Sequence, residues 1–196
     1  MRVSIKAPSI QTLCMIPAFI LFLAGCSRES AQNGAVQAQE TKIDVEQRLR
    51  ELGIQLRTPA PPVANFVHTV RSGNLVFLAG HGPQKADGTW VQGKVGRDMS
   101  LEDGNKAARL TGINMLSSLK AEIGDLNKVR RVVKVLGMVN SDESFTDQPK
   151  VMNGFSDLMV EVFGERGRHA RSAVGMAQLP FGIPVEIEMI VEIEGE

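Results

Sequence analysis

Alternating side chains near the carboxyl end constrain the fold of this chain more than any other sequence feature. Residues 167–176 are followed by a turn and by residues 185–194, where Val, Ile or Met at every second position alternates mostly with glutamate. Side chains of a β-strand point to opposite faces with a period of two, so the second segment is predicted to be a strand with an apolar face and an acidic face. Together the two segments are interpreted as a β-hairpin.

The first strand of this predicted hairpin carries the best candidate for a site. Arg171 shares a face with Ala173 and Gly175, so it stands over a depression between small side chains. If the apolar side chains of both strands face the helices, Arg171 and Glu186 share the opposite side of the sheet. The planar guanidinium binds carboxylates through paired donors. The alternative is a structural ion pair between Arg171 and Glu186 or Glu188.

The amino-terminal residues are expected to lie outside the fold. A short basic region precedes an apolar run over residues 10–23, which ends in Leu-Ala-Gly-Cys26. This layout is typical of a signal peptide, here residues 1–25, and is short for a membrane span. The last four residues resemble the lipobox of bacterial lipoproteins, which implies lipidation of Cys26 and a periplasmic location. Ser27 favours the outer over the inner membrane; an ordinary cleaved signal or an uncleaved anchor is the alternative.

The mature chain is predicted to contain one domain behind a flexible tether. Residues 26–41 are polar and lack periodicity, and residues 42–196 are expected to form the folded domain. Cys14, the other of the two cysteines, lies in the predicted signal peptide, so no intramolecular disulfide is expected. The net charge of zero argues against a general polyanion-binding protein.

Hydrophobic periodicity, caps and turns divide the domain into elements of secondary structure. The order β-β-α-β-α-β-β follows an initial short helix and predicts an α+β fold with two helices packed on one face of a mixed sheet. The expected elements are a helix over 44–52, strands over 66–71 and 75–79, a loop up to 97 with a short strand near Trp90, a helix from Ser100 to Gly124, a strand over 128–139, a helix from Thr146 or Asp147 to Gly164, and the final two strands.

The strand over residues 128–139 predicts an oligomer. Its apolar side chains fall on both faces, with Val133, Val135 and Val139 on one, and Val132, Leu136 and Met138 on the other. A strand that is apolar on both faces needs cover on both, and two helices cover one side of a sheet. We therefore expect a second copy of the chain to cover the other side in a closed symmetric oligomer.

Several short motifs show a family resemblance over roughly residues 66–193. They are Ser-Gly-Asn-Leu-Val-Phe at 72–77 leading to Gly80, Asn-Gly-Phe at 153–155, and Ala-Arg-Ser-Ala-Val at 170–174 with the later Leu-Pro and Val-Glu-Ile-Glu. On these residues the chain resembles the YjgF-like, or reactive intermediate deaminase (RidA-like), family. The resemblance implies a chorismate-mutase-like fold and a homotrimer with clefts between its subunits.

The resemblance also implies a reaction. In deaminating members the arginine of this motif, here Arg171, holds the carboxylate of a 2-imino acid. A glutamate of the last strand, here Glu186, helps to position the attacking water, and the products are a 2-keto acid and ammonia. No metal or organic cofactor is implied. The other expected cleft residues are Phe66, Ala79, His81, Asn153 and Ala173.

Four of these positions depart from the family pattern. Phe66 stands where many members have tyrosine, and Ala173 stands where they have cysteine. Ala79 and His81 replace the serine and the glutamine of the family's Ser-Gly-Gln motif. The sequence therefore predicts an extracytoplasmic RidA-like protein that binds a small carboxylate metabolite, with hydrolysis of imino or enamino acids as its possible reaction. A non-catalytic binding or chaperone-like module with the same cleft is the alternative from a different class.

Metals and nucleic acids are not expected as ligands. The three histidines lack the spacing of metal ligands. Arg166, Arg168, His169 and Arg171 form a basic cluster that could hold phosphate or RNA, and some relatives are described as ribonucleases. Aromatic side chains, on which the bases of RNA stack, do not interleave this cluster, so no nucleic-acid partner is predicted.

Overall fold

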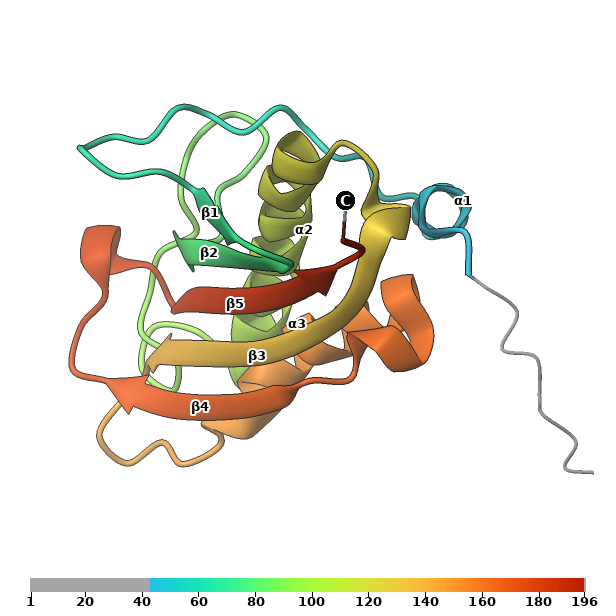
Figure 1. The fold of residues 1–196 in the computed structure, drawn as a ribbon. Coiled ribbons are helices and arrows are strands. Elements are labelled where there is room, and N and C mark those ends of the chain that lie inside the picture. Colours follow the sequence, from blue (N-terminus) through green and yellow to red (C-terminus); the bar gives the residue numbers. More distant parts are fainter. Residues whose placement is uncertain (1–42, 196) are drawn as a thin grey trace, which may run out of the picture. The chain divides into compact units, whose positions relative to one another are not determined.

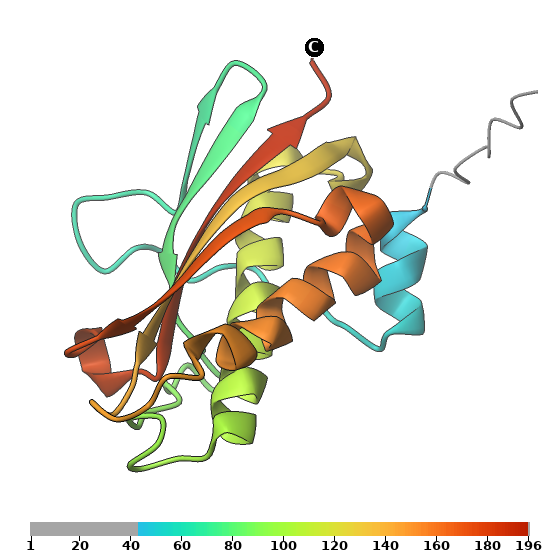
Figure 2. The same ribbon diagram turned by 90° about the horizontal axis from the view of Figure 1, so that it is seen from below.

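The computed structural model describes residues 43–195, so the predicted signal peptide, Cys26 and the whole of the predicted tether lie outside the described residues. Five strands form one sheet, and two long helices pack on one of its faces (Figures 1 and 2). The elements are α1 (Val45–Glu51), β1 (Thr69–Ser72), β2 (Leu75–His81), α2 (Leu101–Ile123), the 3-10 turn η1 (Leu126–Lys128), β3 (Val129–Asn140), α3 (Gln148–Phe163), the 3-10 turn η2 (Gly164–Gly167), β4 (Ala170–Met176), the 3-10 turn η3 (Pro180–Gly182) and β5 (Val185–Ile193). The predicted α+β class and element order are confirmed.

The two long helices begin and end at the residues that the sequence marks. The Ser100 hydroxyl accepts a hydrogen bond from the backbone N–H of Asp103 at the start of α2, and Gly124 ends that helix with a φ of 80°. Asp147 precedes α3, which has proline in its first turn and ends at Gly164. The apolar faces of both helices are buried in one core together with the apolar row of β5.

The predicted hairpin of the last two strands is wrong. The strand order is β1-β2-β5-β3-β4, so β5 lies between β2 and β3, and β4 pairs in parallel with β3 (Figure 1). Strands that are neighbours in sequence pair in only about two-thirds of cases. Here α3 connects β3 to β4 as a crossover, which leaves the place beside β3 open for β5. The remaining pairs of strands are antiparallel.

This pairing also overturns the prediction that Arg171 and Glu186 share one face. Arg171 lies opposite Val135, which is buried under the helices, whereas Glu186 lies opposite Met138 on the helix-free face. Val174, expected to face the helices, is 40% exposed on the helix-free face. Arg171 therefore turns toward α3, and β3 separates it from Glu186.

Three smaller expectations also change. β1 begins at Thr69, so Phe66 precedes the strand and is exposed. The predicted strand near Trp90 is a single bridge to Gln84. In β3 the register shifts near Val133, which is exposed, while the valines at 132 and 135 are both buried; the predicted division of this strand into faces is corrected there.

The helix-free face of the sheet carries exposed apolar side chains within the described chain. These are Val70, Phe77, Val133, Val174 and Met176, which come from four different strands. Figure 2 shows that α2 and α3 both lie on the other side. Among residues 43–195, no helix is both long and apolar enough to cross a membrane.

Candidate functional site

The predicted site residues form two separate groups in one chain. Arg171, Asn153 and Ala173 lie where β4 meets α3, and we call this group the Arg171 cluster. Phe66, His81 and Glu186 line a cavity of about 580 Å³ on the other side of β3, which we call the Glu186 cavity. Ala79 lies beside this cavity in a shallower groove of the helix-free face.

Arg171 is held by neutral acceptors of α3. Its Nη1 donates to Asn153 Oδ1 at 3.1 Å and to Ser156 Oγ at 2.9 Å, and its Nη2 donates to the carbonyl of Pro149 at 3.3 Å. Within the described residues, no carboxylate lies within ion-pair distance of Arg171. The alternative of an ion pair with Glu186 or Glu188 is therefore wrong within one chain. The guanidinium is positioned while its positive charge remains uncompensated.

A relay of hydrogen bonds continues from Arg171 to the backbone. His169 Nδ1 lies 2.7 Å from the carbonyl of Gly167, so this nitrogen must carry the proton. In the neutral ring Nε2 then accepts from the Ser156 hydroxyl at 3.1 Å, while Ser156 Oγ accepts from Arg171. Burial, and secondarily the charge of Arg171, lowers the pKa of His169. The relay fixes the Ser156 hydroxyl as an acceptor for the guanidinium.

Close packing of the two helices places Asn153 next to Arg171. A Cβ on the neighbouring Gly154 would lie 2.1 Å from the carbonyl oxygen of Asn105 in α2, so only glycine permits this approach. Small side chains on β4 have a similar cause. A Cβ on Gly175 would lie 2.9 Å from Gln148 Nε2, and Ala173 packs against the core. The small residues around Arg171 accommodate α3, and the predicted depression beneath the arginine is filled by that helix.

Glu186 reaches the cavity across a glycine. A Cβ at Gly80 would lie about 2.0 Å from Glu186 Oε1, so the absence of a side chain at residue 80 leaves the space that the carboxylate occupies. Burial raises the pKa of Glu186, and the nearby Glu188 raises it further. The carboxyl group therefore accepts a proton more readily than an exposed glutamate does.

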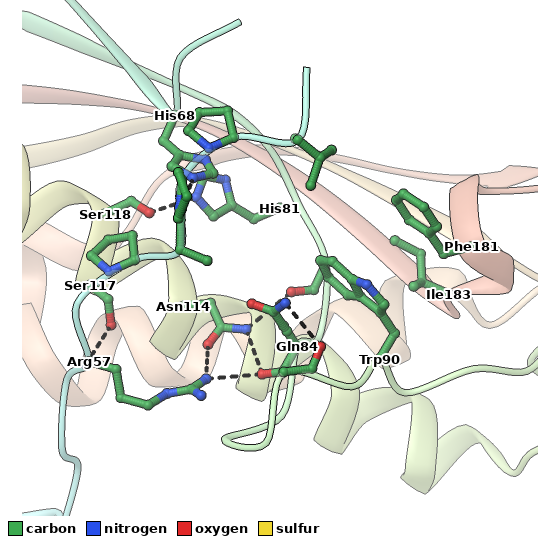
Figure 3. A pocket seen from close by; sticks show the side chains of 18 of the residues that line it. Arg57, His68, His81, Gln84, Trp90, Asn114, Ser117, Ser118, Phe181 and Ile183 are labelled. Carbon is green, nitrogen blue, oxygen red and sulfur yellow. Dashed lines mark hydrogen bonds between the residues drawn. The ribbon is translucent and has the colours of Figure 1, made fainter. Parts of the chain in front are cut away.

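His81 lies in the wall of the cavity with both ring nitrogens engaged. Nδ1 donates to the carbonyl of Ala79 at 2.6 Å, so Nε2 of the neutral ring accepts from the Ser118 hydroxyl at 2.8 Å (Figure 3). Burial lowers the pKa of His81. The hydrogen-bonding capacity of this ring is therefore used within the chain. Phe66 contributes an apolar ring edge-on to His68, which also lines the cavity.

The basic residues near Arg171 do not converge on one point. Arg166 donates to the backbone carbonyls of Val129 and Ile43, and Arg168 pairs with Glu165. These contacts draw the guanidinium groups in different directions, which disfavours a shared phosphate site. Residues 43–195 contain no group of three His, Cys, Asp or Glu side chains that could hold a metal ion.

Sequence reasoning missed several side chains that shape the two groups. Ser156 lies three residues after Asn153, hence on the same face of α3, and this spacing was the available signal. Ser118 and Trp90 have no comparable signal. A serine inside a helix and a lone tryptophan in a loop do not reveal their distant partners.

Several known proteins resemble this chain in sequence and in fold. Residues 46–191 match the family model described as "YjgF/chorismate_mutase-like, putative endoribonuclease", and the chain belongs to this family. Protein TCP17 of Trypanosoma cruzi is 45% identical over 150 residues, which are 76% of this chain and 94% of TCP17. The crystal structure of Atu1372 from Agrobacterium tumefaciens is 46% identical with a TM-score of 0.72, covering 78% of this chain and 94% of Atu1372. RidA from the Antarctic bacterium Psychrobacter is 25% identical with a TM-score of 0.50, covering 71% and 98%.

Proposed function

We propose that this protein is a homotrimer that binds a small 2-oxo or 2-imino acid between copies and hydrolyses the imine. Arg171 of one copy would hold the ligand carboxylate, and the Glu186 cavity of its neighbour would hold the remainder. The observation that carries the proposal is the uncompensated charge of Arg171 among neutral acceptors. Since Arg171 and Glu186 lie on opposite faces of one sheet, a joint site needs two chains.

The chemistry requires little beyond these groups. The carbon of an imine is already electrophilic, so the protein needs to orient it, compensate its carboxylate charge and hold a water. Glu186 is suited to accept a hydrogen bond from that water and to take up its proton, because burial raises the pKa of the carboxyl group. Addition of water to the C=N bond followed by loss of ammonia yields the 2-keto acid, with no oxidant or cofactor consumed.

A non-catalytic binding or chaperone-like module is the second candidate, and the cavity wall favours it specifically. Phe66 offers no hydroxyl group, and His81 has both ring nitrogens occupied by Ala79 and Ser118. Both candidates need Arg171, so binding by itself does not separate them. Release of a keto acid does.

The first experiment titrates pyruvate into the protein by calorimetry. Arg171→Ala should abolish binding, because losing a charge-assisted bidentate contact costs on the order of 2–3 kcal/mol. Arg171→Lys should fail too, since an ammonium group does not reproduce the planar fork. Thermal melts control for folding, because Arg171 also contacts α3. Unchanged affinity in Arg171→Ala refutes the proposed carboxylate site.

The second experiment measures keto-acid release from 2-imino acids that are generated in the assay. Glu186→Gln should retain pyruvate binding and reduce turnover. Binding in the wild-type protein without any turnover would favour the non-catalytic module. A change in affinity without a change in turnover would contradict the role proposed for Glu186.

We also propose that the protein is anchored by lipid at Cys26 on the periplasmic side of the membrane, with Ser27 favouring the outer over the inner membrane. The support is the Leu-Ala-Gly-Cys sequence that ends the apolar run, followed by Ser27. Mass spectrometry of membrane-extracted protein should find an acylated amino terminus at Cys26. Retention of Met1, or a mature terminus elsewhere, would refute the anchor.

A further inference from the structure

The Glu186 cavity extends well beyond the carboxylate after which it is named. Its volume of about 580 Å³ falls in the range of sites for drug-sized ligands. A three-carbon acid would leave most of this space to water. The far part is bounded by the connector at residues 57–63, the loop at residues 82–90 and the turn at residues 180–183, and we call it the apolar chamber.

Aromatic and aliphatic side chains form one wall of this chamber. The rings of Trp90 and Phe181 stack with centroids 5.6 Å apart and an interplanar angle of 3°, and Ile183 lies beside them (Figure 3). A Cβ on Gly82 would lie 2.7 Å from Ile183 Cδ1 and 3.0 Å from the Trp90 ring, so glycine there lets the indole approach the end of β2. Pro59 of the connector also lines the cavity.

Phe181 is held in an unfavourable conformation to complete this wall. Its φ is 58°, and it is the one non-glycine residue with positive φ in the described chain. Such a conformation is unfavourable for a non-glycine residue and persists where surrounding contacts impose it. Here Gln92 Nε2 donates to the Phe181 carbonyl at 2.7 Å, and the N–H of Gly93 donates to the carbonyl of Gly182 at 2.9 Å. The ring is nevertheless 58% exposed, so burial within the chain does not account for it.

The polar groups of the chamber are occupied by one another. Asn114 Nδ2 donates to the carbonyls of Gly82 and Gln84, and its Oδ1 accepts from Arg57 (Figure 3). Arg57 also donates to the carbonyls of Gln84 and Lys85. These bonds fasten the loop to α2 and to the connector, which pre-organises the chamber. They leave few polar groups for a ligand, so the chamber selects for apolar surface.

From these contacts we infer that the ligand is a 2-oxo or 2-imino acid with a bulky apolar, preferably aromatic, side chain that fills the apolar chamber. The inference rests on the proposed function for the placement of the carboxylate. The Glu186 carboxylate shares the same cavity and repels an anion, so the apolar end of the ligand enters the chamber and its carboxylate stays toward Arg171 of the neighbouring copy.

The chain carries its own reporter for this inference. Trp90 is its only tryptophan, and the chain has no tyrosine, so indole fluorescence of the protein comes from the chamber wall. The probe is 3-cyclohexylpyruvate, whose ring does not absorb where indole does, compared with pyruvate. Cyclohexylpyruvate should shift or quench the emission of Trp90, whereas pyruvate at saturation should leave it nearly unchanged.

Calorimetry on the same pair gives the preference. Burial of the ring should tighten binding by about tenfold or more. Phe181→Ala should reduce this preference several-fold, because it weakens the binding of cyclohexylpyruvate more than that of pyruvate. Phe181→Leu, the conservative control, should retain part of it. Equal affinities for both acids, with no response of Trp90 to cyclohexylpyruvate, would overturn the inference.

The two proposals fail in distinguishable ways. If Arg171→Ala abolishes binding of both acids but neither acid is preferred, the carboxylate site stands and the chamber inference falls. If Arg171→Ala has no effect while cyclohexylpyruvate still changes the emission of Trp90, the chamber stands and the proposed carboxylate site falls. A neutral probe, cyclohexylmethanol, should shift or quench the emission of Trp90 in both the wild-type protein and Arg171→Ala. Failure to do so counts against the chamber.

Discussion

The Arg171 cluster and the Glu186 cavity differ in how they hold a charged side chain. Arg171 is half-buried on an edge strand and is fixed by three neutral acceptors on α3. Glu186 lies on a central strand in a partly buried cavity, where its pKa is raised by burial and by Glu188. The first region leaves a positive charge available to a ligand carboxylate, and the second disfavours the ionised form of its carboxyl group. One chain therefore contains two complementary parts, which support a joint site only if copies assemble.

The largest expected effect comes from breaking that assembly. Val174→Glu places a charge on the helix-free face, where burial against another copy would cost several kcal/mol. We expect the trimer to dissociate into monomers and ligand binding to disappear. Sedimentation at micromolar concentration measures the first effect and calorimetry the second. Ala121→Glu, at an exposed position of α2, is the control and should remain trimeric. A wild-type protein that sediments as a monomer would refute the assembly.

The next effect tests the space that Gly80 leaves for Glu186. Gly80→Ala would put a Cβ about 2.0 Å from Glu186 Oε1, so the carboxylate must move. Turnover should fall by at least about tenfold, because small displacements of catalytic groups are costly. In a Glu186→Ala background the same substitution should have little further effect, giving a coupling energy of about 1–3 kcal/mol. Additive effects of the two substitutions would show that Gly80 does not act through Glu186.

A smaller effect is expected from Ser156→Ala. The substitution removes one of the two acceptors of Arg171 Nη1 and the donor to His169. Affinity for pyruvate should weaken by about tenfold, since a hydrogen bond to a charged group is worth about 1.5 kcal/mol. Thr111→Ala is the control, because the buried Thr111 hydroxyl donates to the Ala107 carbonyl of its own helix and Thr111 does not line the Glu186 cavity. Equal losses in both variants would point to a general loss of stability.

The two regions should also respond to pH with opposite signs. The folded pKa of Glu186 is raised, so above the ordinary value of 4.5 the native state binds more protons than the unfolded state. Its contribution to the free energy of unfolding therefore falls as pH rises through the folded pKa. Glu186→Gln should raise the melting temperature at pH 7 relative to wild type and have no such effect near pH 4. A constant difference at both pH values would contradict this.

The smallest effect belongs to the Arg171 cluster. The folded pKa of His169 is lowered by burial first and by Arg171 second. Below 6.5 the unfolded state binds the proton more readily, so stability is lost as pH falls from 6.5 through the folded pKa. His169→Gln should make melting temperatures less sensitive to acid in this window. Melting curves of both proteins over this pH range provide the measurement. Identical pH profiles would contradict the lowered pKa of His169.

Much of this protein follows from local sequence signals. Ser100 and Gly124 mark the ends of α2, and Gly164 marks the end of α3, because caps satisfy backbone groups within a few residues. Alternation in β5 identifies its buried face, and the apolar stripes of both helices are buried as expected. These features depend on neighbours in the chain, so the sequence by itself determined them.

Tertiary structure decided the pairing and facing of β4. Ala173 and Gly175 suggested a ligand depression under Arg171, but they are small because α3 approaches the sheet closely; at Gly137 of the adjacent β3 a Cβ would lie 2.4 Å from Met152 Sδ. Val174 faces the helix-free side although its apolar character suggested the core. Strand pairing depends on which segments bury the most surface together, and close packing selects for small residues just as a binding site does. Alternation shows that a strand has two faces, and the packing partners determine which face each one covers.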